Sequence, residues 1–142
     1  MIVTDELKRS VEIRIPSELG YEKVAMEAAA TVARQMGFSP DRVQDLRTAV
    51  SEACLNAIEH GNKLDVRTRV LVVLTVQPSG LEVNVADSGK ELIPTGQPQA
   101  GRAEDYRGWG MFLIQNLVDE VEVQSEPNVG NQVRMVIRLG EQ

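Results

Sequence analysis

The stretch Ser51-Glu52-Ala53-Cys54-Leu55-Asn56-Ala57-Ile58-Glu59-His60-Gly61 is the most informative part of the sequence. On a helix, at about 100° per residue, Glu52, Asn56 and His60 form one polar stripe with small alanines beside it. A carboxylate and an amide one turn apart can meet the same ligand. The amide oxygen suits a hard cation such as Mg²⁺, and the carboxylate can orient or deprotonate a nucleophile. The alternative is that the stripe is only the solvated side of an amphipathic helix.

The flanks of this stretch predict a helix from residue 39 to residue 60. Ser39 is a good N-cap residue, Pro40 suits the first helical position, and Gly61 offers a stop. Cys54 is expected to be a small core residue, and His60 taken alone is a last-turn residue near the helix C-terminus. The apolar face of the helix comprises Val43, Leu46, Val50, Cys54 and Ala57.

The rest of the chain alternates between strand and helix patterns. The order β-α-α-β-β-loop-α-β-β contains two hairpins, which favours an α+β fold with a mostly antiparallel sheet and helices on one face. We expect one domain over residues 1–142, without internal repeats. Strands are predicted at 10–16, 69–77, 81–86, 120–124 and 132–139, and further helices at 21–36 and 108–119.

Composition restricts the classes of function. The chain has 142 residues, of which 42% are hydrophobic and 25% charged, as in an ordinary globular domain. Its net charge of -6 argues against broad binding to nucleic acid or to an anionic membrane. No apolar run reaches the roughly 20 residues of a membrane helix, and the start of the chain lacks a signal-peptide layout. A cytoplasmic protein is expected, with no nucleic-acid or membrane partner.

Two motifs border a segment without apolar periodicity, from about residue 88 to residue 107. Asp87-Ser88-Gly89 follows a predicted strand, where a carboxylate can accept a hydrogen bond from an exocyclic amine while glycine lets the backbone approach. Arg107-Gly108-Trp109-Gly110-Met111 opens a helix, where backbone N–H groups can meet phosphate oxygens and an arginine can add a charged contact. Taken alone, each motif also fits an ordinary turn or loop-to-helix junction. Long segments of this kind are often functional, and we interpret this one as a lid.

Taken in order, the motifs resemble the GHKL ATPases, and among them the bacterial anti-sigma-factor serine kinases. Residues 51–61 resemble their N box in the form Glu-x-x-x-Asn-Ala-x-x-His. Asp87-Ser88-Gly89 resembles the first glycine box, and residues 108–111 resemble the second. Residues 119–130 look like the ending of these kinases, so the similarity covers the chain from about Val11 to Leu139.

The resemblance implies a Bergerat-type two-layer sandwich, with a mixed, mostly antiparallel sheet, that holds ATP and Mg²⁺ beneath the lid. Asn56 would ligate Mg²⁺, Glu52 would act as the catalytic base or orienting carboxylate, and Asp87 would hold the adenine amino group. The remaining nucleotide-binding positions implied by the boxes are His60, Gly89, Arg107, Gly108, Trp109, Gly110 and Met111. Such kinases bind a sigma factor, phosphorylate a serine on a STAS-domain anti-anti-sigma partner, and usually act as homodimers.

Two departures keep other functions open. The first glycine box commonly has a second glycine where this chain has Glu91, and the lid has few basic residues beyond Arg102 and Arg107. The alternative to a kinase is a nucleotide-gated partner-switch module with little or no kinase activity. A third hypothesis is a water-activating ATPase. His60 is the single histidine and lies in the N box, so the chain is not a self-phosphorylating histidine kinase.

Overall fold

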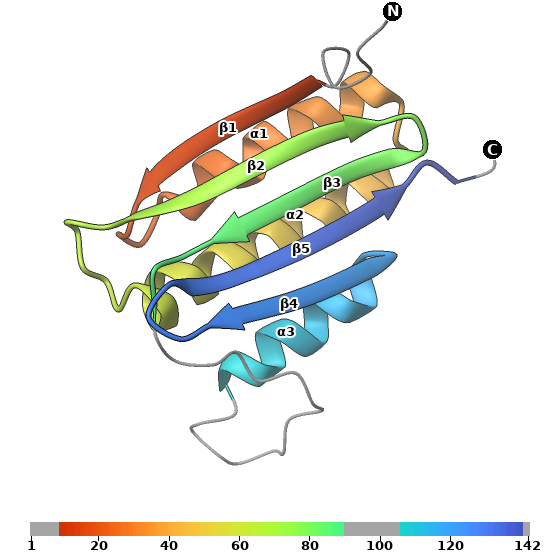
Figure 1. Ribbon diagram of the computed structural model, residues 1–142. Helices are drawn as coiled ribbons and strands as arrows, with labels where there is room; N and C mark the ends of the chain where they lie inside the picture. Colours follow the sequence, from red (N-terminus) through yellow and green to blue (C-terminus); the bar gives the residue numbers. More distant parts are fainter. Residues whose placement is uncertain (1–8, 90–105, 141–142) are drawn as a thin grey trace, which may run out of the picture.

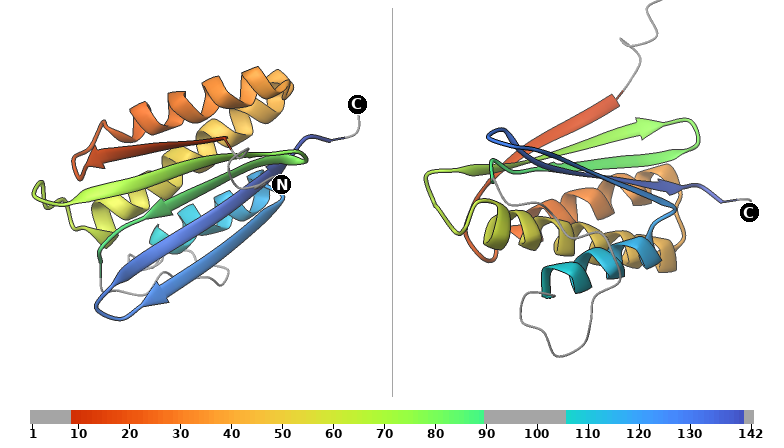
Figure 2. Two further views of the ribbon diagram at one scale, coloured as in Figure 1. Left: turned by 45° about the horizontal axis from the view of Figure 1, so that its top comes forward. Right: turned by 60° about the horizontal axis from the view of Figure 1, so that its bottom comes forward.

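A computed structural model describes residues 9–89 and 106–140 and shows a five-stranded sheet in the order β1-β2-β3-β5-β4. Helices α1, α2 and α3 cover one face of this sheet (Figure 1; Figure 2). The predicted order of elements and the α+β class are confirmed. The elements are β1 (Arg9–Pro16), α1 (Glu22–Met36), α2 (Pro40–Asn56), the π-helical turn η2 (Ala57–Gly61), β2 (Arg69–Gln77), β3 (Gly80–Ala86), α3 (Tyr106–Leu117), β4 (Glu120–Glu126) and β5 (Gly130–Arg138).

All four strand pairings are antiparallel, and their register puts apolar residues of neighbouring strands in common rows. Val72 of β2, for example, lies opposite Ile13 of β1 and Val85 of β3. Alternate residues of a strand point to opposite faces, so each row presents one apolar face to the helices. The C-terminus of α1 and the N-terminus of α2 also form as predicted. Gly37 ends α1 with a φ of 95°, and the Ser39 hydroxyl accepts the Arg42 N–H at 3.3 Å.

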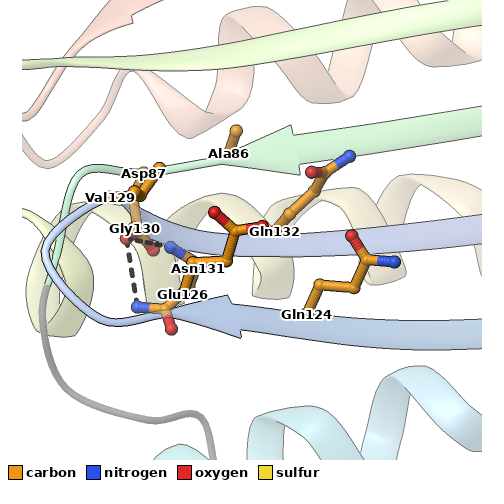
Figure 3. A pocket seen from close by; sticks show the side chains of 8 residues that line it. All are labelled: Ala86, Asp87, Gln124, Glu126, Val129, Gly130, Asn131 and Gln132. Carbon is orange, nitrogen blue, oxygen red and sulfur yellow. Dashed lines mark hydrogen bonds between the residues drawn. The ribbon is translucent and has the colours of Figure 1, made fainter.

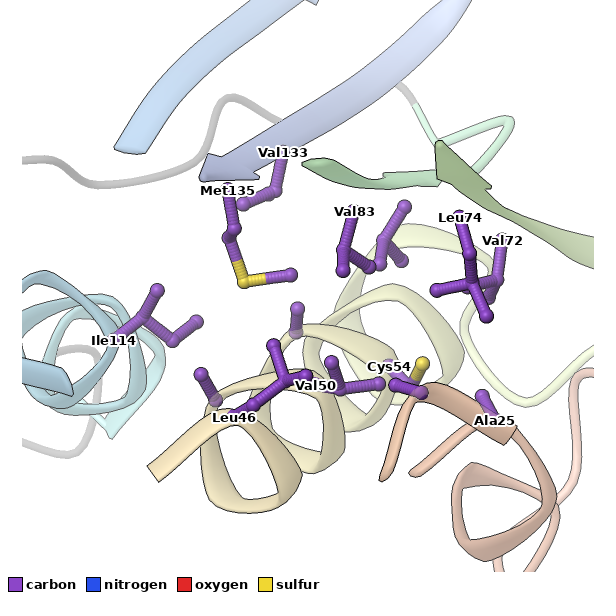
Figure 4. Close-up of a cluster of buried hydrophobic side chains, with 14 of the residues drawn as sticks. Ala25, Leu46, Val50, Cys54, Val72, Leu74, Val83, Ile114, Val133 and Met135 are labelled. Carbon is purple, nitrogen blue, oxygen red and sulfur yellow. The ribbon is translucent and has the colours of Figure 1, made fainter. Parts of the chain in front are cut away.

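The core lies between this apolar face and helix α2. Figure 4 shows Leu46, Val50 and Cys54 of α2 facing side chains of the sheet, with Ile114 of α3 at the side. Burial raises the pKa of the Cys54 thiol to about 12, so the thiol stays protonated and acts as a core residue, as predicted. Helices α1 and α2 pack against each other, and both carry fully buried alanines: Ala25, Ala29, Ala30 and Ala33 of α1, and Ala49 and Ala53 of α2.

The end of the second helix differs from the prediction. After Asn56 the chain makes a π-helical turn in which the Asn62 N–H bonds to the Ala57 carbonyl at 2.7 Å. The actual stop comes later, where the Leu64 N–H bonds to the Ile58 carbonyl at 2.8 Å, as in a Schellman cap. Lys63 takes the left-handed conformation expected at such a cap, with a φ of 52°. The prediction that Gly61 stops the helix is therefore wrong.

Helix α3 begins two residues earlier than predicted and ends two residues earlier. Gly108 and Gly110 therefore lie inside the first turns of the helix rather than before it. Most of the predicted lid, together with Glu91 and Arg102, lies outside the described residues. Within the described ranges, no helix is long and apolar enough to cross a bilayer.

Arg42 of α2 fixes the far end of α3. Its guanidinium donates to the Leu117 carbonyl at 3.0 Å, to Asp119 Oδ2 at 3.0 Å and to Asp45 Oδ2 at 2.9 Å. The same Asp119 oxygen accepts the backbone N–H of Arg138 at 2.6 Å. A cation at the last carbonyls of a helix complements its dipole. One side chain thus ties α3 to the start of α2 and, through Asp119, to the sheet.

Replacing Arg42 by alanine should lower the free energy of unfolding by about 1–3 kcal/mol, because a helix-end carbonyl and a carboxylate lose their donor. Urea unfolding followed by circular dichroism measures this change. Arg67→Ala is the matched control, since the side chain of Arg67 is 87% exposed and, among the described residues, pairs only with Asp65 two residues away. Equal losses in the two variants would contradict an anchoring role for Arg42.

Candidate functional site

The polar stripe of α2 lies against the first turns of α3. A Cβ atom built on Gly110 would lie 3.1 Å from Glu52 Oε2 and 3.6 Å from Asn56 Nδ2. Asn56 is only 6% exposed and Glu52 is half-buried, so the solvated-face interpretation is wrong for Asn56. The second glycine motif therefore lies next to the carboxylate and the amide, and a side chain at position 110 would crowd the Glu52 carboxylate.

Glu52 is electrostatically unlike an ordinary surface glutamate. Burial raises the pKa of its carboxyl group, and the negative charge of Glu59 raises this pKa further. A carboxylate with a raised pKa holds a proton more strongly, which makes it a better acceptor for the proton of a hydroxyl group. Position and chemistry both suit Glu52 to the role of a base.

Asp87, at the end of β3, is held in one orientation by hydrogen bonds. Its Oδ1 atom accepts the Gly89 N–H at 2.7 Å, the Asn131 N–H at 3.2 Å and Asn131 Nδ2 at 3.1 Å. Figure 3 shows the side chains of Asp87 and Asn131 pointing toward each other. Oδ2 accepts no hydrogen bond within the described ranges, and it borders the backbone of Gly61. One carboxylate oxygen is thus fixed by the protein, and the other remains available to a donor on a ligand.

Three glycines make room around Asp87. A Cβ on Gly61 would lie 2.1 Å from Asp87 Oδ2, and a Cβ on Gly130 would lie 2.0 Å from the Asp87 carbonyl oxygen. A Cβ on Gly89 would lie 2.1 Å from the Gly61 carbonyl oxygen. The glycine of the Asp-Ser-Gly motif is therefore required by close backbone contact between two segments.

The two halves of the site lie on successive turns of one helical segment. Asn56 ends α2, and one turn later Gly61 touches Asp87. A cavity of about 510 Å³ opens beside this contact, and its lining residues are Gly61, Asn62, Lys63, Asp65, Thr68, Ser88 and Gly89. A smaller cavity of about 150 Å³ has Asp87 and Asn131 among its lining residues and is the one drawn in Figure 3.

The other predicted positions lie in different surroundings. His60 is half-buried within the π turn. Trp109 is 41% exposed and stacks edge-on against Phe112, whereas Met111 is buried in the core, so only its backbone faces a ligand. Arg107 and Gly108 lie in the first turn of α3.

Sequence reasoning missed Asn131 and Asn62. Asn131 is 3% exposed and orients Asp87, but it contacts a residue far away in the sequence, so local spacing gives no signal for it. Asn62 is 6% exposed; its Oδ1 accepts the Ser88 N–H at 2.8 Å, and its Nδ2 donates to Ser17 Oγ at 3.0 Å. It thereby holds the residue that follows Asp87.

A family model described as the histidine kinase-like ATPase domain matches residues 15–137. The chain belongs to this family. The serine-protein kinase RsbW of Bacillus subtilis is 33% identical over 128 residues, which cover 84% of this chain and 80% of that protein. RsbW of Bacillus licheniformis is 35% identical over 129 residues, with the same coverage. The resemblance to the anti-sigma serine kinases is thereby confirmed, and the chain is a serine/threonine-protein kinase by family.

A solved structure agrees with this kinase-like fold. The crystal structure of the RsbU and RsbW domains of Rv1364c from Mycobacterium tuberculosis superposes with a TM-score of 0.69 at 18% identity. The match covers 94% of this chain and 33% of that longer chain. At this identity the likeness concerns the fold alone, and it supports the Bergerat-type sandwich.

The residues of this kinase-like ATPase domain fit the ATP that its family binds. Asp87 offers a fixed acceptor oxygen, and the glycine at 110 keeps bulk away from the carboxylate and amide of the stripe. The described residues contain no cluster of three or more acidic, histidine or cysteine side chains that would hold a metal alone. Mg²⁺ does not need such a cluster, because it is commonly bound through one or two protein oxygens together with substrate phosphates.

Proposed function

We propose that this protein is an ATP-dependent kinase that phosphorylates a serine on a STAS-domain anti-anti-sigma partner and sequesters a sigma factor or a similar regulator. The observation that carries the proposal is Glu52, whose raised pKa and position against Gly110 and beside Asn56 suit a base in a phosphoryl-transfer site. The similarity to the serine-protein kinases named RsbW supports the same activity. We further propose that residues 1–142 act as one domain and that the kinase works as a homodimer in the cytoplasm.

In this proposal the chain binds the nucleotide through three groups. Asp87 Oδ2 accepts a hydrogen bond from the adenine amino group, while Oδ1 stays bound to Gly89 and Asn131. Asn56 supplies an amide oxygen to Mg²⁺. The backbone at the N-terminus of α3, around Gly108 and Gly110, faces the phosphates, and the helix dipole favours their negative charge there. Bound MgATP supplies the phosphoryl group that is transferred and screens its charge.

Glu52 performs the proton step. It orients the hydroxyl of the substrate serine and accepts its proton as the serine oxygen bonds to phosphorus and ADP departs. Burial, and to a smaller extent the negative charge of Glu59, keep the pKa of Glu52 raised. Arg42, near the start of α2, bonds to the last turn of α3 and so fixes how the two helices pack. This packing keeps Glu52 next to Gly110.

The direct test combines the protein, radiolabelled ATP and a STAS-domain protein encoded in the same genome. Label should appear on a serine of the STAS protein, and its appearance should require Mg²⁺. The competing proposal, a nucleotide-gated binding module, rests on Glu91, which replaces the second glycine of the first box. Calorimetry separates the two, because the module binds ATP and its partner without producing ADP. Failure to bind ATP at all would exclude both.

Glu59→Gln should shift the acidic limb of the pH profile for phosphoryl transfer toward lower pH. The negative charge of Glu59 raises the pKa of Glu52, so removing that charge lets Glu52 ionise at lower pH. The profile of kcat/KM against pH measures the shift. Glu12→Gln, on the outer face of β1, is the charge-matched control and should leave the profile unchanged. A shift of equal size in both variants would show that only net charge matters.

A further inference from the structure

Exposed apolar side chains gather at one end of the molecule. Residues 17–24 comprise the connection from β1 to α1 and the start of α1, and residues 62–69 comprise the connection from η2 to β2 and the first residue of β2. The two segments lie side by side in Figures 1 and 2. The Ser17 hydroxyl joins them through a bond of 2.9 Å to the Thr68 hydroxyl. Of nine exposed large hydrophobic side chains in the described ranges, five belong to these segments. They are Leu19, Tyr21, Val24, Leu64 and Val66, between 40% and 59% exposed, and we name them the end patch.

Leu64, in the end patch, has a backbone conformation that is unfavourable for leucine. Its φ is 59°, a left-handed conformation that costs a residue with a side chain about 1–2 kcal/mol. Glycine or asparagine would adopt the same conformation more easily, and the leucine side chain is 48% exposed. Grouped apolar side chains exposed on a soluble protein mark interaction surfaces.

The end patch is connected to the candidate site. The Asn62 side chain bonds to both, because its Nδ2 donates to Ser17 beside the patch and its Oδ1 accepts the N–H of Ser88, next to Asp87. Glu52 and Gly61 are separated by roughly 13 Å along the helix at 1.5 Å per residue. An ordinary interface of about 800 Å² per partner is roughly 30 Å across. One docked protein therefore reaches from the patch to Glu52.

The charge around the end patch points to the kind of partner. The two segments carry Lys23, Lys63, Arg67 and Arg69 against Glu18, Glu22 and Asp65, in a chain whose net charge is -6. Glu22 is only 8% exposed, which leaves the surface of these segments basic. An acidic partner surface with apolar side chains complements it, whereas the same basic segments of a second copy would be repelled by it.

We propose that the end patch is the docking surface for the protein substrate of the kinase, a folded protein with an acidic and partly apolar face. The proposal rests on the function proposed above. Docking there brings the substrate serine to Glu52, and the Asn62 bonds tie the docked segments to the residue that follows Asp87. The patch contributes binding energy for the protein substrate and none for the nucleotide.

The test is the double variant Leu64→Ser, Val66→Ser in the full chain, assayed with a STAS-domain protein from the same genome. The KM for the STAS protein should rise about tenfold or more, while kcat and the KM for ATP stay unchanged. Val11→Ser, which removes a side chain that is 43% exposed on β1, is the matched control and should change neither KM. A retained thermal unfolding transition excludes misfolding as the cause.

Other results overturn the docking proposal. An unchanged KM for the STAS protein shows that the substrate docks elsewhere, and a raised KM for ATP assigns the patch to the nucleotide site. Loss of a dimer in the double variant, measured by light scattering, assigns the patch to contact between copies. If the wild type transfers no phosphate, calorimetry with the STAS protein separates the two proposals. If the STAS protein binds and the double variant weakens that binding, only the kinase proposal is rejected. If the STAS protein does not bind at all, both the kinase proposal and the docking proposal are rejected.

Discussion

Glu52→Gln should lower the rate of phosphoryl transfer by about 10²–10⁴-fold while leaving the affinity for ATP nearly unchanged. The amide has almost the shape of the carboxylate, so its contact with Gly110 and its place beside Asn56 persist. It cannot accept the hydroxyl proton of a substrate serine. Single-turnover transfer of label measures the chemical step, and fluorescence titration with a labelled nucleotide measures binding.

The same substitution should not weaken the fold. Because the pKa of Glu52 is raised in the folded protein, protonated Glu52 contributes stability that is fully present below the ordinary glutamate pKa. That contribution is lost as the pH rises through the raised value, so at neutral pH the ionised side chain destabilises the fold. Glutamine carries no charge, and the thermal midpoint of Glu52→Gln at pH 7 should equal or exceed that of the wild type. Full activity in this variant would remove Glu52 from the mechanism.

Gly61→Ala should weaken ATP binding by at least about 10–100-fold, equivalent to about 1.4–2.7 kcal/mol. The new methyl group would overlap Asp87 Oδ2 at 2.1 Å. Asp87 cannot swing aside without losing the three hydrogen bonds to its Oδ1 atom. Either the carboxylate leaves the position in which we propose that it meets adenine, or the backbone of the π turn moves. Calorimetric titration with ATP measures the loss.

Gly140→Ala is the matched control for this experiment, because a Cβ at position 140 meets no atom within 4 Å. It should bind ATP like the wild type. The thermal midpoint of Gly61→Ala should fall as well, since overlap with a fixed side chain strains the folded state. Normal ATP affinity in Gly61→Ala would mean that Asp87 does not hold the base.

The sequence predicted the elements of the fold well because their signals are local. Ser39 and Pro40 mark the start of α2, and the Ser39 hydroxyl caps it as expected. Alternation of apolar residues predicted β1 and β3, and a nearly continuous apolar run predicted β2, whose burial alternates along most of its length. Helical spacing put Glu52 and Asn56 on one stripe, and their contact with Gly110 agrees with the order of the motifs.

The prediction was weaker where the role of a residue depends on a contact with a distant part of the chain. A glycine at the end of a helix looks the same whether it stops the helix or makes room for another segment, and Gly61 does the second. Asn131 had the appearance of a turn residue, yet it orients Asp87 across the sheet. The π turn has no sequence signature of its own, because its five residues are four that an ordinary helix accommodates and a final glycine.

The glycines at 61, 89 and 130 come from three separate segments and meet around one aspartate. None of these positions can be changed alone, because each larger side chain would collide with backbone or with the fixed carboxylate. A library that randomises one of them at a time should return glycine, whereas the exposed positions of the chain tolerate many residues. Evolutionary change at any of these three positions therefore requires a compensating mutation in a neighbouring segment.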